Sequence, residues 1–182
     1  MKIMKKNNLL TIILLVFCVK VQAQKLLSNT KVKANQITYK VVGLPKLESE
    51  TIEFNTVYNN NNQYCGKTPK LKLDNGDLIG KIVKNTILNA FNEAFSKARL
   101  KELVQERVLD ITLYLSPTGK VMEVSFLLQK NSSLSALELE NLENALKKNV
   151  YYNLDANLVK NGDFFVVSMW VRYQNILDGF EP

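Results

Sequence analysis

Two short stretches of the sequence have residue types that support catalysis in other proteins. Gly66-Lys67-Thr68 matches the end of a phosphate-binding loop, and Ser28 with Lys31 has the S-x-x-K spacing of β-lactamase-like enzymes. A phosphate-binding loop also needs a glycine five residues before Gly66, where this chain has Asn61, and Pro69 interrupts the helix that should follow. The S-x-x-K stretch has no companion motif downstream. We therefore interpret neither stretch as catalytic.

The sequence contains no histidine and only two cysteines, Cys18 and Cys65. The lack of histidine excludes Ser-His-Asp and Cys-His mechanisms and every histidine-ligated metal site. Two cysteines are too few for a four-cysteine zinc site. We expect Cys65 to be buried and inert, with intermolecular pairing as the alternative. We predict no catalytic, cofactor-binding or metal-binding residue, and interpret the protein as non-enzymatic.

The acidic residues do not form a recognisable catalytic pair. Glu138, Glu140 and Glu143 lie in the first turns of a predicted helix, where carboxylates favour the helix dipole. Asp74 and Asp77 lack the further oxygen ligands of a calcium loop. We interpret all of these carboxylates as solvated surface.

The first 23 residues have the pattern of a signal peptide. Lys2, Lys5 and Lys6 precede an apolar run over residues 9–19, and small residues end the segment at Ala23. An uncleaved anchor and lipidation at Cys18 are the alternatives. The leader resembles those of Bacteroidetes, so we predict an exported protein, periplasmic or associated with the outer envelope.

The charge balance does not favour nucleic-acid binding. The full chain has a formal charge of +7, but residues 1–23 contribute four lysines and no acid, which leaves 20 basic and 17 acidic residues, a net charge of +3. Basic and acidic residues are interspersed, with no run of five basic residues. We predict no nucleic-acid partner, and membrane contact only through an envelope location.

Residues 24–76 are predicted to hold two strands and a polar connection. Residues 37–42 are rich in β-branched and aromatic residues and end at Gly43, and residues 52–58 alternate in polarity. Four consecutive asparagines at 59–62 begin a long polar segment. We place a boundary there, with an α+β domain over residues 77–182.

The second half of the chain switches between helical and strand periods. Apolar residues at steps of three and four predict one amphipathic helix over residues 77–99, with Asp77 as N-cap. Alternation over 109–115 and 122–128, with a turn at Gly119, predicts a β-hairpin. Ser135 and Glu138 fit a capping box that opens a helix to about residue 150, and residues 164–173 predict a last strand.

These elements predict an α+β fold: an antiparallel sheet with two helices packed on one face, in the order β-β-α-β-β-α-β. Residues 78–175 resemble the C-terminal domain of TonB-like periplasmic proteins. The resemblance rests on the hairpin around Gly119, the helix over residues 135–148 with its acidic start and basic end, and the final strand. It implies this fold and the pairing of the last strand with the backbone of a protein partner.

The last strand is apolar on both faces, which is unusual for a sheet with one solvated side. One face holds Phe165, Val167, Met169, Val171 and Tyr173, and we expect it to meet the helices. The other face holds the candidate partner-binding residues, which are Phe164, Val166, Trp170 and Arg172. We expect this second face to be covered by the N-terminal strands, by a second copy of the chain or by a foreign partner, in that order.

The sequence thus favours a protein-binding or assembly module of the bacterial envelope that recognises an extended peptide by strand addition. Its partner is a foreign protein or a second copy of the chain. The alternative is a small-ligand carrier or an enzyme with a pocket between the sheet and the helices.

We predict that the exported protein is cleaved after Ala23, because small residues stand at positions −3 and −1 of that site. N-terminal sequencing of envelope material should begin at Gln24, or be blocked if that glutamine cyclises. Mature protein that still begins at Met1 would contradict the prediction.

Overall fold

The computed structural model describes residues 26–45, 52–69, 80–84, 86–106, 109–154 and 162–180. The predicted signal peptide of residues 1–23, the expected helix N-cap Asp77 and the proposed boundary at residue 76 lie outside these ranges.

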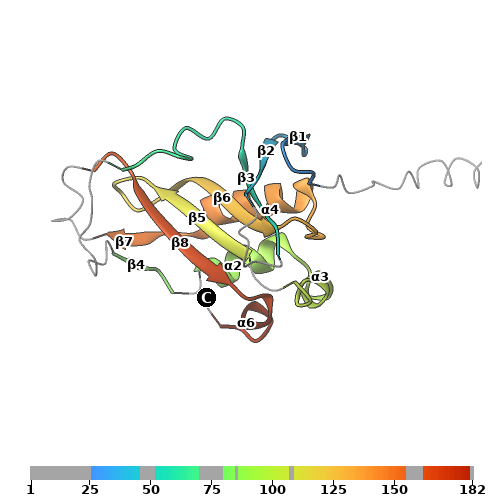
Figure 1. Ribbon diagram of the computed structural model, residues 1–182. Helices are drawn as coiled ribbons and strands as arrows, with labels where there is room; N and C mark the ends of the chain where they lie inside the picture. The colour runs from blue at the N-terminus through green and yellow to red at the C-terminus, as the bar shows by residue number, and fades with distance from the viewer. Residues whose placement is uncertain are drawn as a thin grey trace, which may run out of the picture.

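A six-stranded antiparallel sheet is the centre of the fold (Figure 1). In space its strands lie in the order β1-β2-β3-β6-β5-β8. The two strands predicted in the N-terminal region are confirmed, and both pair within this same sheet. The strands are β1 (Thr30–Lys33), β2 (Thr38–Gly43), β3 (Phe54–Asn59), β5 (Leu109–Leu115), β6 (Val121–Gln129) and β8 (Phe165–Val171).

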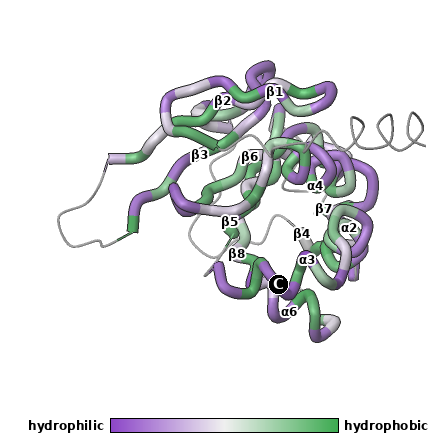
Figure 2. The backbone as a smooth tube through the Cα atoms, turned by 90° about the vertical axis from the view of Figure 1, so that its right-hand side faces the viewer, coloured by the Kyte–Doolittle hydropathy of each residue, from purple (hydrophilic) through white to green (hydrophobic). Residues whose placement is uncertain are grey.

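The helices gather on one side of the sheet, as Figure 2 shows. They are α2 (Thr86–Ala94), α3 (Lys97–Leu103) and α4 (Ala136–Asn149). A short helix α6 (Tyr173–Leu177) follows β8 and packs against α3. The predicted α+β class is confirmed. The chain also forms a second, two-stranded sheet from β4 (Gly80–Ile82) and β7 (Tyr152–Leu154).

The prediction of one helix over residues 77–99 is wrong. Gly80–Ile82 is the strand β4, and the first helix begins only at Thr86. Ser96 then breaks the helical path with an extended backbone, and its hydroxyl caps α3 by accepting the N–H of Arg99 at 3.2 Å. The helical spacing continues through both breaks because strand and helices place their apolar residues in the same core.

The predicted β-hairpin is confirmed as β5 and β6, joined by a turn at Gly119. Gly119 has a φ of +84°, and a Cβ on it would lie 1.9 Å from the carbonyl oxygen of Tyr152. Both the left-handed backbone and this close approach require glycine. The turn therefore fixes the hairpin register and the position of β7 together.

The predicted capping box is also confirmed at the start of α4. The Ser135 hydroxyl accepts the backbone N–H of Glu138 at 3.2 Å, and the Glu138 carboxylate accepts the N–H of Ser135 at 2.8 Å. Glu138 also pairs with Arg99 of α3 at 2.6 Å. The first turn of α4 is thus held by local bonds and by a neighbouring helix.

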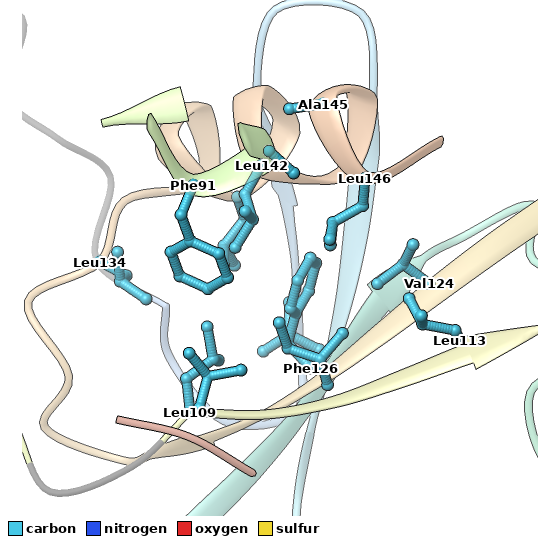
Figure 3. Packing of buried hydrophobic residues seen from close by; sticks show 14 of the residues in the cluster. Phe91, Leu109, Leu113, Val124, Phe126, Leu134, Leu142, Ala145 and Leu146 are labelled. Carbon is cyan, nitrogen blue, oxygen red and sulfur yellow. The ribbon is translucent and has the colours of Figure 1, made fainter. Parts of the chain in front are cut away.

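Apolar side chains from α2, α4 and the sheet form the core. Figure 3 shows Phe91, Leu142 and Leu146 pointing from the helices toward Leu109 and Phe126 on the sheet. All five are fully buried. This layer is the main source of hydrophobic stabilisation between the helices and the strands.

The last strand is shorter than predicted, because β8 spans Phe165–Val171 and Tyr173 begins α6. The prediction for its inward face holds. Phe165, Val171 and Tyr173 are buried, and Val167 and Met169 pack partly buried against the core.

Glu143 of α4 is fully buried, so its interpretation as solvated surface is wrong. The Tyr39 hydroxyl of β2 donates to its Oε2 at 2.7 Å, and Lys147 Nζ lies 2.7 Å from its Oε1. Burial raises the pKa of Glu143, and the bonds from Lys147 and Tyr39 oppose that rise. The carboxylate thereby connects β2 to α4.

Glu140, one turn earlier on α4, is buried as well, so its interpretation as solvated surface is also wrong. Its carboxylate accepts backbone N–H groups from the turn between β1 and β2: Asn35 at 2.7 Å, Gln36 at 3.0 Å and Ile37 at 3.4 Å. Three charge-assisted hydrogen bonds therefore hold the β1–β2 turn against the helix.

No helix in the described ranges is long and apolar enough to cross a membrane.

We predict that Phe91→Ala lowers the free energy of unfolding by about 3–5 kcal/mol, because a fully buried ring is lost from the core. Lys97→Ala, an exposed change on the adjacent helix, should stay within about 0.5 kcal/mol of the parent. Chemical denaturation measures both values. Equal effects would contradict the assignment of this helix face to the core.

Candidate protein-binding face

The face of the large sheet opposite α2 and α4, which we call the outer face, carries the candidate partner-binding residues. The register between β5 and β8 sets its rows: Trp170 lies opposite Asp110, Ser168 opposite Thr112, and Val166 opposite Tyr114. Directly paired residues in antiparallel strands share a face of the sheet. The polar residues of β5 and the second apolar face of β8 therefore form one surface.

One end of the outer face is covered by an aromatic cluster. Tyr64, from the polar connection after β3, places its ring 4.9 Å from Phe164 and 6.2 Å from Tyr114, between centroids. Phe164 is only 3% exposed as a result. Phe164 is thus a covered residue, and it does not offer a surface to a partner.

The cover comes from a different segment than the sequence predicts. Strands β2 and β3 are expected to lie over the outer face, but β3 pairs with β6 of the hairpin and β2 pairs with β3, in the plane of the sheet. Tyr64 provides the cover, and its hydroxyl lies 3.7 Å from the sulfur of Met122 on β6. No periodic pattern marks Tyr64, because it stands in an asparagine-rich connection.

The covered end contains polar groups that are held by one another. The Tyr114 hydroxyl lies 3.4 Å from the Ser125 hydroxyl. Burial raises the pKa of Tyr114 to about 12, and the neighbouring Cys65 thiol adds to this rise. Cys65 is half-buried here, so it is less buried than the sequence predicts.

The other end of the outer face is open, and Trp170 dominates it. Its side chain is 74% exposed, the largest fraction among the exposed large apolar residues in the described ranges. The indole Nε1–H donates to Asp110 Oδ2 at 3.0 Å, which fixes the orientation of the ring. The first-ranked expectation, a cover by the N-terminal strands, is therefore not met at this end, since β2 and β3 pair in the plane of the sheet.

Asp110 is a residue of this face that the sequence did not single out. Its Oδ1 is buried and has no hydrogen-bond partner among the described residues. Burial raises the pKa of Asp110, and the hydrogen bond from Trp170 opposes that rise. Its position on the polar face of β5 was evident from the alternation, but its pairing with Trp170 needs the register of β8.

Arg172 lies at the same end of the outer face, whereas Val166, opposite Tyr114, lies toward the covered end. The hydroxyls of Thr112 and Ser168 lie 2.9 Å apart in the next row. Arg172 is exposed just past β8, and Val166 is half-buried. The open end therefore presents one anchored indole, a pair of hydroxyls and a guanidinium, which suit contacts with another protein chain.

The edge of β8 is the second feature of the candidate site. β8 is the last strand of the sheet, and no strand in the described ranges pairs with its outer edge. Its seven residues include neither a charge nor a proline. The opposite edge, β1, has only four residues and carries Lys31 and Lys33. Short length and lysines protect an edge from pairing, and β1 has both of these features whereas β8 has neither.

The described residues do not bring three or more histidine, cysteine or carboxylate side chains together in a way that could hold a metal ion.

Comparisons with known proteins establish the fold and no more. No protein-family model matches the sequence, and no curated protein matches it. The crystal structure of a DUF5043 family protein from Bacteroides uniformis ATCC 8492 is similar, with a TM-score of 0.64 and 20% sequence identity. The match covers 82% of this chain and 91% of that chain.

We predict a pH-dependent effect of Asp110→Asn on stability. The pKa of Asp110 is raised by folding, so the folded state holds this proton more tightly. The carboxyl then favours folding at low pH, and that contribution is lost as pH rises through the folded-state pKa. The variant does not titrate at this position, so its free energy of unfolding should improve relative to the parent as the pH rises from below to above the ordinary aspartate pKa of about 3.9.

Urea denaturation of both proteins across that pH range measures the difference. Any constant effect of the amide, including its unpartnered donor, cancels when values at different pH are compared. If the difference in free energy of unfolding between the two proteins does not change with pH, or shifts in favour of the parent as pH rises, then burial does not disfavour the ionised form of Asp110.

Proposed function

We propose that this protein is an exported, non-enzymatic module of the envelope of a Bacteroidetes-type bacterium, and that it binds an extended segment of a protein partner along the edge of β8. The observation that carries the proposal is the seven-residue, uncharged edge of β8 beside an anchored, exposed tryptophan. The neighbouring DUF5043 structure from Bacteroides uniformis supports the bacterial group.

Strand addition accounts for the edge. An unpaired strand presents a row of N–H and C=O groups, and an extended peptide satisfies them in the way a neighbouring strand would. A short edge strand with charged side chains protects a protein from aggregation through that edge, and β1 has both features. The length of β8 and its lack of charged residues and proline favour an edge that is used.

Trp170 and Arg172 account for affinity beyond the backbone bonds. Tryptophan and arginine are enriched among the residues that dominate binding energy at protein interfaces. The hydrogen bond to Asp110 fixes the indole before binding, so little side-chain entropy remains to be lost. An added strand would place its alternate side chains over this ring on the outer face.

The resemblance to TonB C-terminal domains supports the same mode of binding, because their final strand pairs with the backbone of a partner. The signal-peptide pattern of residues 1–23 supports export. Together they support a partner in the periplasm or at the outer envelope.

Photocrosslinking tests whether the partner is an extended strand. A photoreactive residue is placed at Val166 or at Trp170, which share the outer face and lie about 13 Å apart along an antiparallel strand. An extended partner should give crosslinks about four residues apart in one segment, whereas a helix covers this distance with about nine residues.

Leu137 is the matched control position, since it is exposed but lies on α4, on the helix side of the molecule. A crosslink there to the same segment, or a spacing that fits a helix, would overturn strand addition.

A synthetic peptide of the crosslinked segment then gives an affinity. Trp170→Ala should weaken its binding by about 30-fold, the effect of losing a residue worth about 2 kcal/mol at an interface. Leu137→Ala should leave the affinity unchanged. Hydrogen exchange should show protection at every second amide of β8, because only alternate N–H groups point to the open edge.

A further inference from the structure

We propose that β8 also pairs with β8 of a second copy of this chain, antiparallel, about a two-fold axis that passes at Ser168. This inference rests on the proposed function, because it assumes that the edge of β8 accepts a strand.

Symmetry limits the registers that two copies of one strand can adopt. A two-fold axis perpendicular to the sheet continues the same face from one copy to the next, so each residue must lie opposite a residue of its own face. With Ser168 opposite itself, all seven residues of β8 are paired. A shift by two residues leaves two residues of each strand unpaired, and a shift by one exchanges the faces.

The side chains of β8 complement one another in this register. Trp170 lies opposite Val166 of the second copy, on the outer face. On the inner face, Phe165 lies opposite Val171 and Met169 lies opposite Val167. Each pair thus combines a large side chain with valine, and aromatic residues opposite β-branched ones are favourable cross-strand neighbours.

The lack of charged residues on β8 favours self-pairing at this edge, whereas the two lysines of β1 oppose self-pairing at the opposite edge. A two-fold axis brings like side chains together, and β8 has no charged residue to oppose itself. On β1, a register centred on Lys31 places that lysine opposite itself, and one centred on Val32 places it opposite Lys33. Like charges directly opposite destabilise a strand pair, so β1 is unsuited to the same contact.

Self-pairing also gives Trp170 a neighbour. In the monomer its ring is anchored on Asp110 yet 74% exposed. In the paired form each indole packs beside Val166 of the other copy, near the axis. One strand pair is a small interface compared with the total of about 1,600 Å² that is typical of stable complexes. We therefore expect a concentration-dependent equilibrium between monomer and dimer.

Opposite charges at Ser168 test the axis directly. Ser168 is exposed on the outer face, so Ser168→Glu and Ser168→Lys should both fold. Each variant alone places two like charges at the axis and should be monomeric at concentrations where the parent is dimeric. Mixing the two should restore a dimer of one Glu and one Lys chain. Sedimentation measures mass, and circular dichroism confirms folding.

Thr112→Glu and Thr112→Lys are the matched controls. Thr112 lies directly beside Ser168 on the same face but one strand further from the axis. Two such charges would be about 14 Å apart across the axis, beyond the screening length of about 10 Å at 0.1 M salt. These variants should dimerise like the parent.

A cysteine at the axis gives a second measurement. In a background with Cys18 and Cys65 changed to serine, Ser168→Cys should form an intermolecular disulfide, because directly opposite residues have Cα atoms about 4.5–5.5 Å apart, which a disulfide spans. Thr112→Cys should crosslink far less under the same oxidation.

A parent that stays monomeric up to its solubility limit would overturn self-pairing. A dimer that neither Ser168 charge disrupts would overturn it as well, because the contact would then lie elsewhere. The proposed function has a separate outcome: foreign crosslinks four residues apart at Val166 and Trp170 would support it even if the protein never dimerises.

Discussion

The buried carboxylates of α4 are the interaction on which the arrangement of the sheet depends. Glu143 is fully buried, and an ionised group in that position is tolerated only with partners, here Tyr39 and Lys147. Glu140 binds the backbone of the β1–β2 turn in the same way. Without the Tyr39 hydroxyl, or without the backbone N–H groups of the β1–β2 turn, one of these buried carboxylates would lose hydrogen bonds that compensate for its burial. The N-terminal strands are therefore held beside the helix, in the plane of the sheet.

This arrangement leaves the sheet with two unlike edges. The N-terminal strands continue the sheet beyond β6 and end at β1, a short edge that carries two lysines. The other edge, β8, is longer and uncharged. Because β1–β3 are used to extend the sheet, they cannot also lie over its outer face. The open end around Trp170 is thus a consequence of where α4 binds the N-terminal turn.

The sequence predicted the features that depend on neighbouring residues. Gly119 at the hairpin turn and the pair Ser135–Glu138 act within a few residues of themselves, so their patterns were sufficient. The helix over residues 77–99 failed because Ser96 is an ordinary polar position in a helical pattern until its backbone is known to be extended. Burial of Glu143 was not predictable either, since Tyr39 lies 104 residues away in the chain.

The candidate site shows the same division between local pattern and long-range pairing. Alternation along β8 identified its second apolar face. Phe164 and Trp170 share that face, but Phe164 is buried and Trp170 is exposed. Tyr64 covers the Phe164 end, while Trp170 stays 74% exposed with its indole N–H on the Asp110 carboxylate. A tryptophan fixed in place and left in water gains little for the folded monomer, whereas a partner strand that covers it gains the burial of the whole ring. The exposed and oriented indole therefore supports the proposed binding of a partner strand.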